Sequence, residues 1–520
     1  MLKAEYVVTP TEMDPGVFEK LIPADHYLRR LKAAIDFEPW RALVADCYAA
    51  GMGAPAEDPV RLLKVSLLQF PYDLSDSQVV RHAQGNVAFR FFLDVSLDSP
   101  LPVPSLLWQF RTRVGVERFT RIFNDLLRRA RARGLVKDRL RLKDATHLIA
   151  NIAIPSTLRL VAQTREQGLV TAEGFAASDV AEQRAQLDAM RTAPADLSDG
   201  QRLLARVTHL RALVGWGEQW PQRVRAAAAE DRPSATAEQA TALSAALAVA
   251  HKVRNDREPG ATAKLRARAD TEARAGKPGD YYEGSLLDVS MEADSELICA
   301  LEVLPANGAE GANAPHLITS EEQAPGNDIA NLSIDRIGDR GDLLAALSDD
   351  VHGPHLTVYV PPLDWLPPAP ELFQPAAFLL NEAREEVRCP GGATTRTRKR
   401  SERGHGWRFA FSIPQCRACP VRAQCVKPDA QRGRTVIKSD YEAQYQKARQ
   451  RAQNAAYHAV RREHPGIERK LAELVYWHAG RRVRYRGRLK VKIQYVLTAL
   501  VVNCKQMVKL LALPRQPQLA

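Results

Sequence analysis

The stretch Leu140-Arg141-Leu142-Lys143-Asp144-Ala145-Thr146 alternates between apolar and polar side chains. Successive side chains of a β-strand point to opposite faces of the sheet, so this alternation predicts a strand. Leu142, Asp144 and Thr146 share one face of that strand. We therefore expect a sheet that begins here, with an acidic side chain on the same face as apolar neighbours.

The region before this strand, to about Gly134, is predicted to be helical. Asp58-Pro59 places a capping side chain and a first-turn proline ahead of apolar residues at helical spacing, namely Val60, Leu63, Leu67 and Leu68. Two interpretations of the region stay open: a compact DNA-binding domain, or a helical bundle with a solvated basic end. That basic end is the cluster Arg128, Arg129, Arg131 and Arg133.

After the first strand the composition changes several times. Residues 156–257 are Ala-rich, helical in pattern and without recognisable chemistry. Strand signals return at 285–291 and 297–303, with Asp294-Ser295 suited to a hairpin turn between them, and again at 330–334. Residues 354–433 are rich in proline and hold four of the seven cysteines. Long helical signals run from Asp440 to Leu511.

The chain has 520 residues and a formal net charge of +12. A basic surplus favours a polyanionic partner, although charge alone raises nucleic-acid binding only to about even odds. The N-terminus lacks the pattern of a secretory signal, and no apolar run is long enough to suggest a membrane span. We expect a cytoplasmic protein without a membrane partner.

Three acidic residues, Asp144, Asp335 and Glu468, are the candidate catalytic and metal-binding residues. Two fall in or directly after expected strands, and Glu468 falls on an expected helix. Two-metal phosphoryl transfer needs carboxylates from different elements that converge on the ions, and Mg²⁺ prefers such oxygen ligands. Taken singly, each acid has a plainer interpretation: a strand-end cap, a turn former and a solvated helix face.

A dense basic run with an aromatic residue inside it follows Glu468. It is suited to the phosphates of a DNA backbone, with the aromatic ring stacking on a base, and the alternative is a solvated basic loop. The candidate DNA-binding residues here are Arg469, Lys470, Arg481, Arg482, Arg484, Tyr485, Arg486, Arg488 and Lys490.

Cys389, Cys416, Cys419 and Cys425 lie together in the Pro-rich segment. The two-residue gap between Cys416 and Cys419 lets both thiolates reach one tetrahedral ion, which favours structural Zn²⁺ over free thiols. A basic segment between the cysteines, with Arg398, Lys399 and Arg400, is predicted to contact DNA, although a solvated loop is the alternative. The remaining cysteines, Cys47, Cys299 and Cys504, have the apolar surroundings of buried small residues.

Five segments together carry a family resemblance. They are 143–146 (KDAT), 270–277 (DTEARAGK), 303–307 (VLPAN), 333–338 (SIDRIG) and 467–487, which starts with IERKLAEL. The chain resembles bacterial insertion-sequence transposases of the DDE class, in particular the IS eleven-eighty-two family. In that family Asp144 and Asp335 match the catalytic aspartates, and Glu468 matches the glutamate on a helix with a basic continuation.

The resemblance implies an α/β fold: an RNase-H-like mixed sheet core with an all-helical N-terminal domain. It also implies that the N-terminal domain binds terminal inverted repeats, and that two Mg²⁺ or Mn²⁺ ions support strand cleavage and strand transfer. The partners would be double-stranded DNA at the element ends and at the target, bound by a homodimer in the bacterial nucleoid. We expect a DNA-binding domain (1–139), a first core strand (140–157), a helical insertion (158–258), continued core (259–345), a cysteine-rich insertion (346–435) and C-terminal core helices (436–512).

The chain departs from the family pattern at several positions. His464 stands where an arginine is common, four residues before the glutamate, and Arg336 and Tyr476 replace other usual residue types. These departures motivate an alternative function, a decayed or domesticated transposase that binds DNA without cutting it. A third interpretation is a stand-alone RNase-H-like nuclease.

Overall fold

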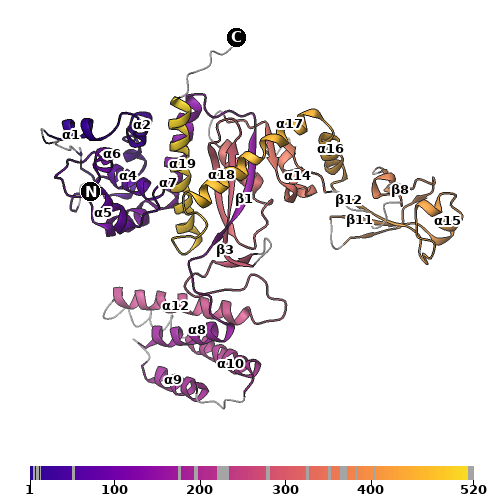
Figure 1. Cartoon of the computed structure of the whole chain (residues 1–520). Helices are drawn as coiled ribbons and strands as arrows, with labels where there is room; N and C mark the ends of the chain where they lie inside the picture. Colours follow the sequence, from indigo (N-terminus) through magenta and orange to yellow (C-terminus); the bar gives the residue numbers. More distant parts are fainter. Residues whose placement is uncertain are drawn as a thin grey trace, which may run out of the picture.

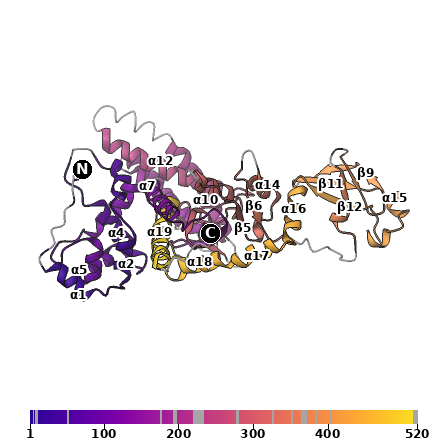
Figure 2. The same ribbon diagram turned by 90° about the horizontal axis from the view of Figure 1, so that it is seen from above.

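The computed structural model describes the chain except for residues 4–5, 7–10, 12, 50–52, 174–176, 192–196, 219–232, 277–280, 324–326, 350–352, 364–371, 382, 384, 402–404 and 513–520. A central sheet is flanked on one side by the N-terminal helices, and a helical arm extends from it (Figure 1). The cysteine-rich segment forms a lobe at the far end of the molecule from the N-terminal helices, in both ribbon views (Figure 2).

The N-terminal region is helical, as predicted. The side chain of Asp58 accepts a hydrogen bond from the Val60 backbone N–H and caps α4, with Pro59 in the first turn. The long helix α7 is interrupted at Gly115, where φ is 70°. The helices are α1 (Asp14–Leu21), α2 (Tyr27–Ala34), α3 (Trp40–Leu43), α4 (Pro59–Gln69), α5 (Asp76–Gly85), α6 (Val87–Leu93) and α7 (Pro104–Ala132), with a 3-10 turn η1 (Ala45–Cys47).

The sheet is mixed, with the strand order β2-β3-β1-β5-β6 and β4 also paired with β3. β3 is antiparallel to β1, β2 and β4, and the predicted hairpin between residues 285–291 and 297–303 is confirmed by the pairing of β3 with β4. β1, β5 and β6 are parallel. The strands are β1 (Arg141–Ile149), β2 (Arg274–Gly276), β3 (Tyr282–Glu292), β4 (Ile298–Pro305), β5 (Asn331–Ile334) and β6 (Thr357–Tyr359).

Helices from the second half of the chain pack on the sheet. α18 (Pro465–Tyr476) contacts β1, and α19 (Arg488–Ala512) contacts both β4 and α7. α19 is long and apolar enough to cross a membrane, but 67% of its apolar window is buried inside the protein, which is the behaviour of a core helix. The other helices near the sheet are α13 (Ala314–Glu322), α14 (Gly341–Ser348), α16 (Glu442–Ala452) and α17 (Ala455–Glu463), with the 3-10 turn η2 (Arg336–Gly338).

The arm and the lobe have small cores of their own. The arm consists of α8 (Thr157–Ala172), α9 (Ala177–Arg191), α10 (Asp199–Glu218) and α12 (Pro233–Asn255), which agrees with the predicted helical insertion. The lobe packs two three-stranded sheets around Phe378, Val387 and Phe409. Its elements are η3 (Pro375–Ala377), β7 (Leu379–Asn381), β8 (Glu386–Arg388), β9 (Thr394–Thr395), β10 (Arg398–Arg400), β11 (Gly406–Ala410), α15 (Ile413–Arg417), η4 (Arg422–Gln424) and β12 (Thr435–Ser439).

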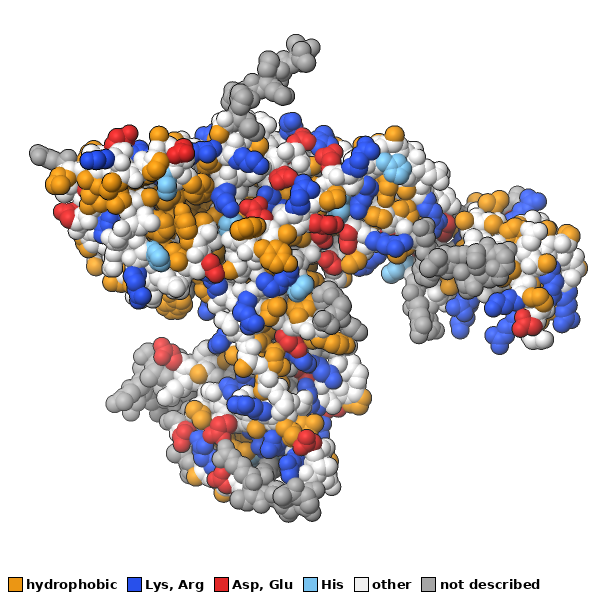
Figure 3. All heavy atoms as spheres, viewed as in Figure 1, with side chains coloured by type: hydrophobic (Ala, Val, Ile, Leu, Met, Phe, Trp, Pro, Cys, Tyr) orange, Lys and Arg blue, Asp and Glu red, His pale blue; other side chains and the backbone are white. Residues whose placement is uncertain are grey.

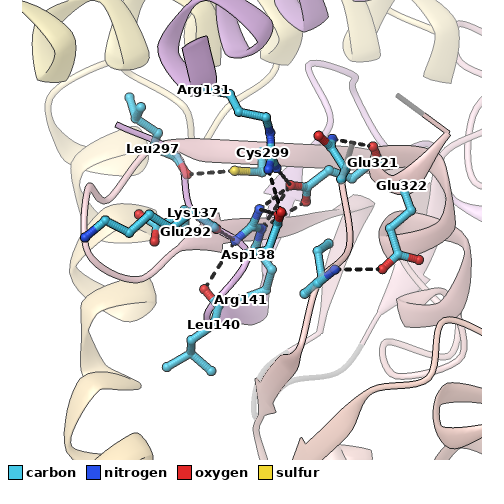
Figure 4. Close-up of polar contacts among 12 residues, drawn as sticks. Arg131, Lys137, Asp138, Leu140, Arg141, Glu292, Leu297, Cys299, Glu321 and Glu322 are labelled. Carbon is cyan, nitrogen blue, oxygen red and sulfur yellow. Dashed lines mark hydrogen bonds and ion pairs between the residues drawn. The ribbon is translucent and has the colours of Figure 1, made fainter. Parts of the chain in front are cut away.

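A buried ion network joins the N-terminal helices to the sheet (Figure 4). Arg141 of β1 is fully buried and donates from Nε to both carboxylate oxygens of Glu321, at 3.0 and 3.1 Å. Arg131, near the end of α7, pairs with Asp138 at 2.7 Å and lies 3.8 Å from Glu321. The basic end at residues 128–133 is partly solvated: Arg128 and Arg133 are exposed, although Arg128 and Arg129 pair with Asp125 and Arg133 donates to the Ala34 carbonyl.

Candidate active site

Asp144 lies in β1, and Asp335 directly follows the neighbouring parallel strand β5. Lys143 of β1 is in register with Ile334, the last residue of β5, and each of the two aspartates is the next residue along its chain segment. Residues in register on paired strands point to the same face of the sheet. The two aspartates are therefore neighbours at this end of the paired strands, although 190 residues separate them in the sequence.

Glu468 approaches the same place from α18. The start of this helix lies close to the sheet, since a Cβ at Gly466 would stand 3.5 Å from Leu142 Cδ1 and 3.6 Å from Met291 Cε. Gly466 is buried, and these are ordinary van der Waals distances, so the start of α18 packs directly on β1 and β3. Glu468 follows in the first turn of α18 with an exposed side chain.

The electrostatics connect the three acids. The pKa of Asp144 is raised to about 6, first by burial and then by the negative charges of Asp335 and Glu468. Burial also raises the pKa of Asp335, while the positive charge of Lys143 opposes this. Like charges raise a pKa only over short distances. Asp335 and Glu468 therefore lie within electrostatic reach of Asp144, although the three residues are far apart in the chain.

A fourth acid, Glu310, was missed by the sequence analysis. Its pKa is raised to about 7, first by burial, and the charges of Asp335 and Asp144 also raise it. Its backbone carbonyl accepts a hydrogen bond of 2.7 Å from Lys143 Nζ, which holds the loop after β4 beside β1. The segment 303–307 was recognised as a motif, but no spacing rule connects a loop acid three residues further on to a distant strand.

Lys143 is the buried cation beneath this site. It is 1% exposed and forms an ion pair of 2.7 Å with Asp288, which is fully buried. Asn313 also donates to Asp288, at 3.0 Å. Asp144 is therefore next in β1 to Lys143, whose charge already pairs with the carboxylate of Asp288.

The donor set suits hard divalent cations, which prefer carboxylate oxygens. Within the residues that the structure describes, no group of three or more His, Cys, Asp or Glu side chains is arranged so that it could hold a metal ion. The carboxylates nevertheless repel one another, and a cation between them would relieve that repulsion. The residues therefore fit a divalent metal by donor type and by charge.

Two family models match the chain. Residues 16–113 match a Transposase domain (DUF772), and residues 388–508, which include Glu468, match a Transposase DDE domain. The chain is a DDE transposase. No curated protein and no solved structure matches it.

The DDE domain makes this protein an enzyme of phosphoryl transfer and implies DNA transposition activity. Transposases bind DNA, and DDE transposases typically use divalent metal ions. The predicted recognition is confirmed to the level of an insertion-sequence DDE transposase. Asp144 and Asp335 lie outside both matched segments, so their place in the transposase rests on the sheet geometry.

The basic residues predicted to bind DNA divide into two groups in the transposase. Several are engaged within the protein: Lys470 is 4% exposed and pairs with Glu473, and Arg481 donates to the His147 carbonyl. The prediction that Lys470 binds DNA is therefore wrong, because its buried side chain cannot contact a DNA strand. Four more are engaged: Arg484 pairs with Asp73, Arg488 with Glu272 and Arg469 with Glu296, and Tyr485 lies under Arg111. The exposed group consists of Arg482, Arg486 and Lys490.

The lobe shows the same division. Arg398 pairs with Glu385 and lies over the Trp407 ring, and Arg400 pairs with Asp440. Lys399 is exposed, and its cross-strand partner Arg408, which the sequence analysis missed, is exposed beside it. Neither forms an ion pair with another described residue. Side chains alternate between the two faces of β10, so Lys399 lies on the opposite face from Arg398 and Arg400 and is available to contact DNA.

The four cysteines of the lobe are free thiols that line one cavity of about 170 Å³. Burial raises the pKa of Cys425, and the other three cysteines add to that rise. The backbone N–H of Arg434 donates to Cys416 Sγ at 3.4 Å. The predicted zinc insertion is not seen as a metal group among the described residues, although its cysteines come together. Cys299 and Cys504 are buried, whereas Cys47 is only partly buried.

Proposed function

We propose that this transposase belongs to a bacterial insertion sequence of the IS eleven-eighty-two type, and that it binds the terminal inverted repeats and cuts and joins DNA strands. The proposal is carried by the geometry of the sheet: Asp144 lies in β1, Asp335 directly follows the paired parallel strand β5, and Glu468 lies in the first turn of α18, which contacts β1. These three side chains are the proposed catalytic residues. The proposal extends to an RNase-H-like core, supported by an antiparallel β4-β3-β1 set that continues into parallel β5 and β6.

The chemistry follows from the donor set. Asp144, Asp335 and Glu468 would hold two Mg²⁺ or Mn²⁺ ions, which supply activation of the attacking oxygen and stabilisation of the leaving oxygen. The protein fixes their positions: one carboxylate is carried by β1, one directly follows the paired strand β5, and the third is carried by a helix packed on the same sheet. Lys143 shares its charge with Asp288, so it does not form an ion pair with Asp144.

The DNA-binding surfaces are part of the same proposal. We assign inverted-repeat recognition to the N-terminal helices and backbone contacts to the exposed cations Arg482, Arg486, Lys490, Lys399 and Arg408. Lys and Arg side chains are concentrated on the lobe, which would lengthen the DNA contact (Figure 3). Two DNA ends must be held together during transposition, so we propose that the active form is a homodimer.

Strand cleavage on DNA that carries the element's ends tests this function. Supercoiled DNA with the sequences that flank the reading frame is expected to be nicked and joined in Mg²⁺ or Mn²⁺. The same plasmid without those flanks is the control and is expected to stay intact. Binding to the ends without cleavage would favour the decayed transposase, and equal cutting of both plasmids would favour a stand-alone nuclease.

Without metal, the stability of the transposase is expected to fall as the pH rises from about 4 to about 7. A raised pKa means that the folded state binds the proton more tightly than the unfolded state, so stability is present below the ordinary pKa and is lost as pH rises through the folded value. In the folded state the pKa is about 6 for Asp144 and about 7 for Glu310. Mg²⁺ is therefore expected to raise the Tm at about pH 8 and much less at about pH 5, because protons compete for the carboxylates.

Thermal unfolding with and without Mg²⁺ at both pH values measures this effect. Asp144→Asn is expected to lose most of the metal-dependent shift. Asp342→Asn is the matched control, since Asp342 pairs with Arg340 and the pKa of Asp342 is not affected by the candidate acids. Equal Mg²⁺ shifts at both pH values would contradict the prediction.

We also propose that Cys389, Cys416, Cys419 and Cys425 bind a structural zinc ion in the lobe. Support comes from their shared cavity and from the N–H donated to Cys416 Sγ, because thiolates favour such donors. Metal analysis of the purified transposase is expected to give about one zinc per chain, lost in Cys416→Ser. Cys47→Ser is the control and should keep the metal, whereas a folded, zinc-free wild type would refute the site.

A further inference from the structure

Arg461 is anchored at the end of the strand that leads to Asp335. Its Nη1 donates to Ser333 Oγ at 3.0 Å and to the Ile334 backbone carbonyl at 2.9 Å. Ser333 is fully buried, and Ile334 is the last residue of β5. Arg461 itself belongs to α17, the helix before α18, so one side chain connects the strand of Asp335 to the helical segment of Glu468.

Among the described residues, the Arg461 guanidinium has no carboxylate partner at ion-pair distance. Both of its acceptors are neutral, and no Asp or Glu in the described part of the chain forms an ion pair with it. It nevertheless lies within electrostatic reach of Asp335, Glu468 and Asp144, whose charges oppose the lowering of its pKa by burial. A half-buried cation without a counter-ion is unfavourable unless an anion arrives.

His464 contacts the same serine hydroxyl as Arg461 but carries no charge. His464 is 2% exposed, and its Nδ1 lies 3.1 Å from the same Ser333 Oγ. Burial, followed by the charge of Arg461, lowers its pKa to about 4, so the imidazole is neutral near pH 7. Arg461 can only donate to Ser333 Oγ, which leaves the hydroxyl proton for His464 Nδ1. His464 thus supports the hydroxyl that holds the arginine, and the charge comes from a residue one turn earlier.

We propose that Arg461 binds a non-bridging oxygen of the scissile phosphodiester and is a further catalytic residue of the transposase. Two contacts of Nη1 fix the plane of the guanidinium and leave the Nη2 and Nε donors for an incoming anion. A DNA phosphate that reaches the three acids brings the missing negative charge. The inference rests on the proposed strand-cutting function.

Single-turnover cleavage of end-carrying DNA by Arg461→Gln, Arg461→Lys and wild type tests the proposal. Removing one preorganised donor that faces developing charge typically costs on the order of a hundredfold to a thousandfold in rate, and we expect a loss of this size for Arg461→Gln. Arg461→Lys keeps the charge and should recover at least about tenfold over Arg461→Gln. The matched control is Arg462→Gln, which removes an exposed neighbouring arginine outside the site.

A second substrate separates phosphate contact from a structural role. When the scissile phosphate is replaced by an uncharged methylphosphonate, the loss caused by Arg461→Gln should shrink to less than about tenfold. The same loss on both linkages would overturn the proposal, as would Arg461→Gln cleaving within about threefold of Arg462→Gln. If the wild type cut neither substrate, the proposed function itself would fail instead.

Discussion

Asp335→Asn is expected to lower strand cleavage by about a thousandfold or more while the protein still folds and binds DNA. Metal-held carboxylates supply several kcal/mol of charge stabilisation in the transition state, and each 1.36 kcal/mol is about tenfold in rate. Asn has nearly the same shape, so the packing at the end of β5 is kept. Burial and neighbouring acids raise the carboxyl pKa values at this site, so removal of one charge also relieves repulsion.

Cleavage and binding must be measured on the same DNA. Band shifts with end-carrying fragments should remain within about threefold of the wild type, while nicking disappears. Asp342→Asn is the control, since its carboxylate pairs with Arg340 and its pKa is not affected by the candidate acids. If Asp335→Asn nicked DNA at the wild-type rate, the assignment of the second catalytic aspartate would be wrong.

Arg141→Met is expected to cost about 3–5 kcal/mol of the free energy of unfolding. Arg141 is fully buried and pairs with Glu321, whose side chain is 5% exposed, so removal of the arginine leaves an uncompensated buried carboxylate. The network also includes Arg131 at the end of α7 (Figure 4). The loss would therefore weaken the connection between the N-terminal helices and the sheet.

Denaturant unfolding of single and double variants measures this cost. Arg141→Met combined with Glu321→Leu should recover most of the lost stability, because neither charge is then left unpaired. Arg128→Ala is the control: its ion pair with Asp125 has an arginine side chain that is 70% exposed, and such pairs contribute roughly 0–1 kcal/mol. A double variant as unstable as Arg141→Met alone would contradict the explanation.

Local patterns in the sequence determined much of the secondary structure and of the family. Asp58-Pro59 starts a helix because its capping chemistry is local, and the alternation at 140–146 gives β1 because side chains of a strand alternate. The hairpin of β3 and β4 follows from a short turn between two strands. The motif around Glu468 lies in the segment that matches the DDE domain.

The tertiary structure alone decided which charged residues are available. Lys470 and Lys490 both lie in the basic region near Glu468, yet one is buried against Glu473 and the other is exposed. Glu310 and Arg461 join the acids through a loop and a helix that no spacing rule relates to β1 and β5. A charge acts through distance and burial, and both depend on contacts between segments that are far apart in the chain.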